Sequence, residues 1–505
     1  IEGAVSQQNM LDNIEWAPKV GLNSYMLEFK VPYIFYDRWY SHRDNKHKRS
    51  ERITVETVKQ YKVALETEIS KRGLIYNDMG HGWTCEPFGI EGIGWDKEKL
   101  DIPDDIKQYL AEIDGKREIY GDVPLNTNIC MSNPEARKKV VDYMADYAES
   151  HTNVDYLHIW LADGKNNHCE CKECRKMDTA DHYVVLLNEM DEELTKRKLP
   201  IKLVFIAYVD LYWPPIEKRF NNPSRFTLLF APITRTYSES YGLNADLNAY
   251  IPYDRNNLKY PVGMAQNLAY LEKWQEIFSG DSFIYEYHFM WDHYKDPGYF
   301  DLGRTILNDI RALKKHNING IIEDQTQRSF LPTGFPEYLY GQAMFDPELT
   351  FEELAEDFFS HSFGDDWKLC MDYCAEISRL FDPAYMRGER GIEGKPFYNP
   401  SHVSDLDRIP LAVNEFIQVI ERNSHHDIRS VEVSWRYMHY HARIIKRLAN
   451  ALSAKAEGDD SRAYMLWEDT LDYAATHEDF YQPVFDVSTF ATVMRRIFGS
   501  RPSME

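Results

Sequence analysis

Short apolar runs alternate with amphipathic segments through the first two thirds of the chain. Helical spacing of apolar residues marks several of the intervening segments, as at Val184, Leu187, Met190 and Leu194. The apolar runs read as strands and begin near Val20, Leu74, Leu125, Val154, Ile201, Phe226, Ser282 and Ile318. Apolar strands separated by helices are typical of parallel strands buried on both faces. The pattern predicts an α/β fold, a (β/α)8 TIM barrel. An open doubly wound sheet is the alternative, although no Gly-rich phosphate loop follows any strand.

The strand pattern stops after about Asp346. Helical periodicity then continues over residues 351–363, 367–381, 409–420, 431–452 and 460–473, with Pro and Gly at the breaks. We therefore expect a barrel over residues 1–345, followed by an α-helical domain over residues 346–505 that packs on it.

Composition excludes several classes of protein. Of the 505 residues, 43% are hydrophobic and 28% charged, which is typical of a globular chain. The net charge of −23 argues against a nucleic-acid partner. No apolar stretch approaches the ~18 residues of a membrane span, and no signal peptide is visible. The 34 Tyr, 25 Phe and 11 Trp are an aromatic content often used to bind carbohydrate. The oligomeric state stays open.

Carboxylates follow several of the predicted strands. In a barrel, residues at the C-terminal ends of strands gather at one rim, where catalysis takes place. Asp163, Glu286, Glu323 and Asp324 are the candidate catalytic residues, because glycoside hydrolysis needs a protonated carboxyl group and a second stabilising group. Glu286 stands out, since it interrupts an apolar, aromatic run. For any single one of them, an ion pair or a strand-end cap is the simpler interpretation.

Aromatic and amide side chains lie at the same predicted strand ends. Aromatic rings stack on sugars, and planar amides bind vicinal hydroxyls. At least half of the aromatic residues are expected to be core residues instead. The candidate substrate-binding residues are His81, Trp83, Asn126, Asn128, Trp160, Tyr208, Tyr285, Tyr287, His288 and Trp291.

Three cysteines crowd together directly after the fourth predicted strand. Cys169, Cys171 and Cys174 form a C-x-C-x2-C pattern, which is a partial zinc site that needs a fourth ligand such as His168 or Cys85. Such a zinc would be structural, and no cofactor is expected for catalysis. The equally weighted alternative is a loop whose thiols pack or form one disulfide.

These residues resemble a known family. The stretch from Trp160 to Gly164, the cysteine pattern, and Gly80-His81 are similar to domain of unknown function 4838, and within that group the chain resembles glycoside hydrolase family 163. The resemblance implies an endo-β-N-acetylglucosaminidase of Bacteroides-type gut bacteria that acts outside the cytoplasm on N-glycans or glycoproteins.

The implied mechanism is retaining and substrate-assisted, since the 2-acetamido oxygen of the sugar attacks the anomeric carbon. The resemblance implies Glu286 as acid/base and Asp163 as the carboxylate that orients the acetamide, with Glu323 or Asp324 as replacements for either. The sequence departs from several substrate-assisted families at Gly164, where those families carry a second, adjacent carboxylate.

Two other functions stay open. One is an exo-acting glycosidase on glucuronic acid or a terminal hexosamine, for which Arg38, Arg235 or Arg328 would bind an acidic sugar. The other is a non-catalytic carbohydrate-binding surface protein.

Overall fold

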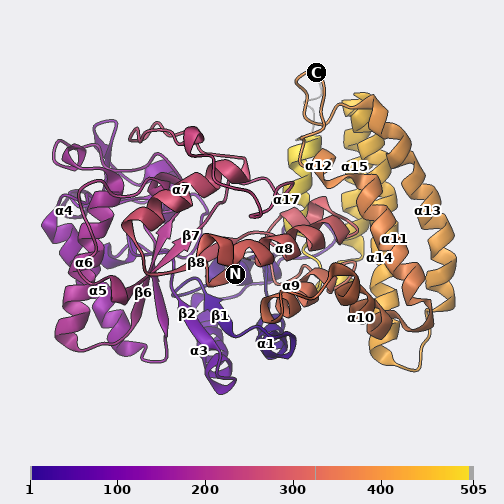
Figure 1. Ribbon diagram of the computed structural model, residues 1–505, viewed down its shortest axis with the longest axis horizontal. Coiled ribbons are helices and arrows are strands. Elements are labelled where there is room, and N and C mark those ends of the chain that lie inside the picture. Colours follow the sequence, from indigo (N-terminus) through magenta and orange to yellow (C-terminus); the bar gives the residue numbers. More distant parts are fainter. Residues whose placement is uncertain (1–2, 325, 500–505) are drawn as a thin grey trace.

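The computed structural model describes residues 3–324 and 326–499 and has an α/β fold (Figure 1). Its main sheet is entirely parallel, with neighbouring strands in the order β1-β2-β5-β6-β7-β8-β9. The strands are β1 (Ser24–Leu27), β2 (Ile75–Asp78), β5 (Tyr156–Ile159), β6 (Lys202–Ala207), β7 (Phe226–Phe230), β8 (Asp281–Glu286) and β9 (Gly320–Glu323). A two-stranded hairpin, β3 (Glu112–Ile113) and β4 (Lys116–Arg117), lies apart from this sheet.

The sheet curls into a nearly closed barrel. Its two edge strands, β1 and β9, approach each other: Ser24 and Met26 on β1 and Ile321 and Glu323 on β9 line one cavity of about 170 Å³. Seven of the eight predicted strands are thus confirmed, and the parallel order follows the chain.

The predicted strand near Leu125 is wrong. Residues Pro124–Asn126 form a 3-10 turn, and Ile129 makes an isolated bridge to Leu110, so β2 pairs directly with β5. The polar side chains of this segment bind other loops. Asn128, for example, donates a hydrogen bond to Asn167. Asn and Thr side chains that bond to backbone and loop groups compete with strand pairing, which is the physical reason for the difference.

Helices connect the strands and lie beside the sheet (Figure 1). At the start of α5, the Asn133 side chain accepts hydrogen bonds from the N–H groups of Glu135 and Ala136, which fixes where this helix begins. The helices before residue 346 are α1 (Gln7–Trp16), α2 (Tyr33–Ser41), α3 (Val55–Lys71), α4 (Asp104–Lys107), α5 (Pro134–Ser150), α6 (Thr179–Arg197), α7 (Met264–Ile277), α8 (Phe300–Ala312) and α9 (Phe335–Phe345).

The later part of the chain is helical and stands at one end of the molecule (Figure 1). A second hydrophobic core lies here, around Trp435 and Trp467, and α8 and α9 contribute Ile306 and Leu339 to it. The division at residue 345 stays a prediction. These helices are α10 (Phe351–Phe363), α11 (Trp367–Phe381), α12 (Pro383–Met386), α13 (Val403–Arg422), α14 (Arg429–Glu457), α15 (Asp460–Thr476), α16 (Glu478–Tyr481) and α17 (Val487–Phe498). Across residues 3–324 and 326–499, none of the helices combines the length and apolar character that a membrane crossing requires.

Candidate active site

A cavity of about 310 Å³ opens where the strands of the barrel end. Its lining residues lie at or after the C-terminal ends of β1, β2, β5, β6, β7, β8 and β9, the rim at which barrel enzymes place their chemistry. Eight of the predicted site residues line it: His81, Trp160, Asp163, Tyr208, Tyr285, Tyr287, Trp291 and Asp324. Glu28, Arg38 and Trp95 line it as well.

Aromatic rings form much of the cavity wall. Tyr287 and Trp291 are parallel, with ring centres 5.7 Å apart and planes inclined by 2°. Trp160 meets Tyr285 edge to face at 5.3 Å. Flat apolar faces beside polar groups are the surface on which a sugar ring stacks.

Asp163 is held at the rim by two donors. The indole N–H of Trp95 donates to Oδ2 and the phenol of Tyr208 donates to Oδ1, each over 2.9 Å. Because each oxygen atom accepts one bond, the plane of the carboxylate is fixed relative to the cavity. Trp95 is not among the residues predicted from sequence, because it lies in an irregular loop after β2 and is marked by no motif.

Asp324 lines the same cavity and is buried, with 4% of its surface exposed. Burial, and then the nearby Glu28 carboxylate, raise the pKa of Asp324 well above its usual range. Glu28 is itself within 3.2 Å of the Nε2 atom of His81. A raised pKa favours the protonated, neutral form of the Asp324 carboxyl group, which is the form that a general acid requires.

Glu286 does not line the cavity, contrary to the expectation from sequence. Its carboxylate accepts hydrogen bonds from Arg235 at 2.7 Å and from Tyr237 at 2.9 Å, and Tyr241 also donates to it. Successive side chains along a strand point to opposite faces, so with Tyr285 and Tyr287 in the cavity, Glu286 points away from it. Arg235 is thus the charged partner of Glu286, which the local sequence around Glu286 does not reveal.

Glu323 belongs to the same buried cluster. It is the β9 residue in register with Glu286 on β8, so both carboxylates face the same side. His288 lies between them and α8, with Nδ1 3.0 Å from Glu323 and Nε2 3.0 Å from Asp309. Burial lowers the pKa of His288, but the carboxylates of Glu323 and Glu286 outweigh it and raise the pKa to about 10. We name Arg235, Glu286, His288, Asp309 and Glu323 the buried charge cluster.

The remaining predicted binding residues also lie outside the cavity. Trp83 is a core residue, and its indole N–H donates to the carbonyl of His158 at 2.8 Å. Asn128 accepts a hydrogen bond from the backbone N–H of Ala162, so it orders the loop after β5. Asn126 contributes its carbonyl to the side chain of Asn167 in that loop. These three residues therefore contact β5 and the loop after it and do not line the cavity.

The three arginines considered for an acidic sugar have different surroundings. Arg38 lines the cavity, with its guanidinium 5.9 Å from the ring of Trp95. Arg235 belongs to the buried charge cluster, and Arg328 pairs with Asp486 at 2.6 Å.

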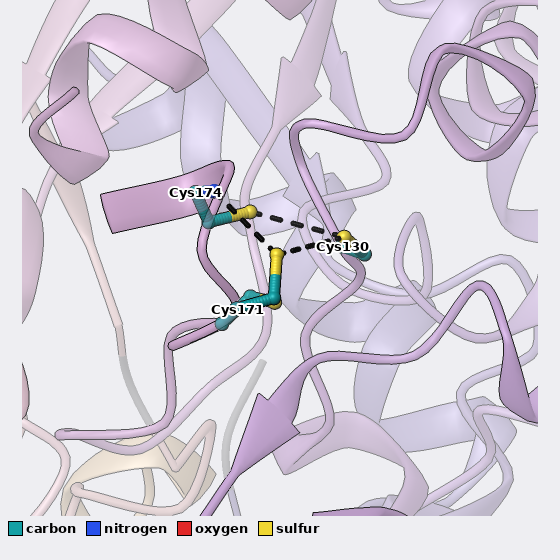
Figure 2. Close-up of side chains that lie close together, drawn as sticks. Cys130, Cys171 and Cys174 are labelled. Atoms are coloured by element: carbon teal, nitrogen blue, oxygen red, sulfur yellow. Dashed lines mark hydrogen bonds between the residues drawn. The ribbon is translucent and has the colours of Figure 1, made fainter. Parts of the chain in front are cut away.

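The cysteine pattern forms a cluster with a fourth member, Cys130, which was not predicted from sequence (Figure 2). The thiols of Cys130, Cys169, Cys171 and Cys174 lie within 4.8 Å of one another. The two expected fourth ligands lie elsewhere, His168 in the cavity lining and Cys85 beside the carbonyl of Gly82. No regular spacing connects Cys130 to the other three in the sequence.

Solved structures of three glycosidase-related proteins resemble this one. A GH138 enzyme targeting pectin rhamnogalacturonan II has 10% identity and a TM-score of 0.50, over 97% of this chain and 74% of that one. A mutant O-GlcNAc hydrolase of Thermobaculum terrenum has 12% identity and a TM-score of 0.40, over 99% and 94%. The protein CpGH84B has 11% identity and a TM-score of 0.43, over 98% and 75%. At these identities, the likeness to the GH138 enzyme concerns the fold alone.

Curated protein sequences yield no match to this chain. The sequence profile of a domain of unknown function, DUF4838, matches residues 104–367. The matched region begins before β3 and ends at the start of α11, so it includes Asp163, Asp324 and the cysteine cluster. Because the match extends over more than half of the 505 residues, the chain belongs to the DUF4838 family.

Proposed function

We propose that the protein is a glycoside hydrolase whose active site is the cavity at the C-terminal ends of the strands. The observation that carries this proposal is Asp324, a buried carboxyl group with a raised pKa that shares an aromatic-lined cavity with Asp163. A neutral acid and a second, oriented carboxylate are the pair that glycosidic bond cleavage needs. A protein that only binds carbohydrate gains little from an acid kept protonated at neutral pH.

In this mechanism Asp324 replaces Glu286 as the general acid. Asp324 donates its proton to the leaving glycosidic oxygen as the bond from that oxygen to the anomeric carbon breaks. Its carboxylate then takes a proton from the water that completes hydrolysis. Asp163 stabilises the opposite side of the sugar, in an orientation set by Trp95 and Tyr208.

The substrate we propose is the GlcNAc-β1,4-GlcNAc core of complex N-glycans, which makes the enzyme an endo-β-N-acetylglucosaminidase. The resemblance to glycoside hydrolase family 163 supports this substrate. The acetamide oxygen of the sugar would form the bond to the anomeric carbon, and Asp163 would accept a hydrogen bond from the acetamide N–H. On this proposal the enzyme works outside the cytoplasm on glycoproteins, and its catalysis requires no cofactor.

Mass spectrometry of a glycoprotein that bears complex N-glycans tests the proposal. The wild-type protein should release whole glycans and leave one GlcNAc on each Asn. Asp324→Asn and Asp163→Asn should each reduce the rate by a factor of about 10²–10⁴. Asp104→Asn is the matched control, because that carboxylate is 96% exposed and does not line the cavity. Normal rates in Asp324→Asn would contradict the assignment of the acid.

Arg38 favours a second candidate function, an exo-acting glycosidase on an acidic sugar. Of the three candidate arginines, Arg38 lines the cavity, whereas Arg235 and Arg328 do not. Stepwise loss of terminal sugars in the same experiment, or hydrolysis of an aryl glucuronide that Arg38→Gln abolishes, would establish this alternative. No turnover of either substrate class would favour a carbohydrate-binding protein.

A further inference from the structure

Four thiols from two distant segments of the chain converge behind the rim of the cavity. The Sγ atom of Cys130 lies 3.7 Å from that of Cys171 and 3.8 Å from that of Cys174 (Figure 2). Cys169 completes the group, and all four thiols are free of disulfides. A tetrahedral zinc ion with Zn–S bonds of about 2.3 Å separates its sulfur ligands by about 3.8 Å. These two separations match the edge of such a tetrahedron, all four sulfur atoms lie within 4.8 Å of one another, and a disulfide bond would be about 2.05 Å.

We propose that Cys130, Cys169, Cys171 and Cys174 bind one structural zinc ion. Four thiolates fill the tetrahedral coordination of zinc and leave no open position for water or substrate. The ion would therefore stabilise the fold and take no part in hydrolysis.

Backbone N–H groups already point at three of the sulfur atoms. Glu112 donates to Cys169 and Ser132 to Cys174, each over 3.3 Å, and Cys174 donates to Cys171 over 3.5 Å. Arg117 on β4 lies beside Cys130. Hydrogen bonds and a positive charge around the sulfur atoms offset the negative charge of a zinc ion with four thiolate ligands. Packed neutral thiols would have no need of this arrangement.

The cluster lies where the expected third strand is missing. Cys130 follows Ile129, which makes only an isolated bridge, while the other three cysteines belong to the loop after β5. Between β2 and α5 the described chain has only short helical turns, the four-residue α4 and a hairpin of two strands with two residues each. A metal ion that joins both segments would supply the stability that strand pairing does not provide here.

This connection also reaches the catalytic rim. The side chain of Asn167, two residues before Cys169, donates hydrogen bonds to the carbonyls of Asp163 and Asn126. The zinc ion would thus hold the loop that carries Asp163 against the irregular segment beneath it. The inference rests on the thiol geometry and is independent of the reaction that the cavity catalyses.

Metal analysis of the full-length protein, purified without chelators, is the first test. Elemental mass spectrometry should find about one zinc ion per chain, and X-ray absorption at the zinc edge should find only sulfur ligands at about 2.3 Å. A nitrogen ligand in the spectrum would contradict Cys130 as the fourth ligand and favour His168. Iron in place of zinc would overturn the metal assignment. If the protein neither contains zinc nor binds it after full reduction, or if peptide mapping finds the four cysteines in two disulfides, the proposal is wrong.

A pair of variants isolates the contribution of Cys130. Cys130→Ala should lower the zinc content at least tenfold. Cys370→Ala should leave the zinc content unchanged, because Cys370 is a buried free thiol on α11 and does not belong to the cluster. If Cys130→Ala does not fold, addition of Co²⁺ to the metal-free wild-type protein gives a second readout. It should produce the visible absorption of tetrahedral cobalt together with thiolate-to-cobalt charge transfer. Absorption typical of six-coordinate cobalt would overturn the site.

Discussion

The Nη1 atom of Arg235 lies 2.7 Å from the Oε1 atom of Glu286, and both side chains are completely buried. The same nitrogen atom lies 2.9 Å from Asp309. This pair gives the buried carboxylate of Glu286, which ends β8 between Tyr285 and Tyr287, a partner of opposite charge.

Replacement of Glu286 by Gln should therefore destabilise the protein. Removing one partner of a buried ion pair costs about 3 kcal/mol, because the other charge remains without full compensation. Urea unfolding should show this loss, whereas Glu352→Gln, in an exposed pair with Arg304, should change the free energy of unfolding by less than about 0.5 kcal/mol. A Glu286→Gln protein of normal stability but without activity would contradict this role and indicate that Glu286 is catalytic.

The charge of His288 should make stability depend on pH in the alkaline range. Its pKa is about 10 in the folded protein, against about 6.5 in an unfolded chain. Between these values the native state holds a proton that the unfolded state has released, so the free energy of unfolding falls as the pH rises. This contribution is complete below about pH 6.5 and is lost as the pH approaches 10.

Thermal melting between pH 6 and pH 10 should show a steeper decline of Tm for the wild-type protein than for His288→Asn. His361→Asn, at a residue whose side chain is 79% exposed, serves as the control and should keep the wild-type slope. Equal slopes for all three proteins would show that His288 is neutral in the folded state.

Asp324 should lower stability at neutral pH while it serves catalysis. Its folded pKa is raised by burial and by Glu28, so above about pH 4 the native state keeps a proton that the unfolded chain releases. The free energy of unfolding should therefore fall as the pH rises from about 4 toward the folded pKa.

Asp324→Asn removes this titration. We expect the variant to unfold at a higher urea concentration than the wild type at pH 7, to match it near pH 4, and to lose hydrolytic activity. A variant that is active, or one whose stability follows the wild-type pH profile, would contradict the role of Asp324.

Tyr208 should act as a positioning residue through its hydrogen bond to Asp163. Loss of one preorganised donor commonly costs about 10²-fold in kcat, so Tyr208→Phe should lower kcat more than it changes KM. Tyr473→Phe is the control, because Tyr473 lies on α15 outside the cavity. A change confined to KM would indicate that Tyr208 binds the substrate directly.

Much of the fold is encoded locally. Alternation of apolar runs with helical stripes predicted eight parallel strands, and seven of them are present in the expected order, because burial on both faces demands continuous apolar residues. The same periodicity predicted α10, α11, α13, α14 and α15. The run near Leu125 does not form the predicted strand, since its apolar residues resemble a strand while Asn126 and Asn128 bind neighbouring loops.

The candidate site was predicted in part. Strand ends indicated the rim, so Asp163, Asp324 and most of the aromatic wall were found from sequence. The alternation of side chains at the end of β8 also indicates that Tyr285 and the following Tyr287 share one face and that Glu286 faces the other side.

Only the tertiary structure decided the contacts between residues that are distant in the sequence. Arg235 reaches Glu286, Trp95 reaches Asp163, and Cys130 joins the thiols of the loop after β5. Periodicity records which face of an element is buried, because burial acts on each residue separately. The partner of a buried charge or thiol depends on how loops fold back over the sheet, and no local pattern in the chain carries that information.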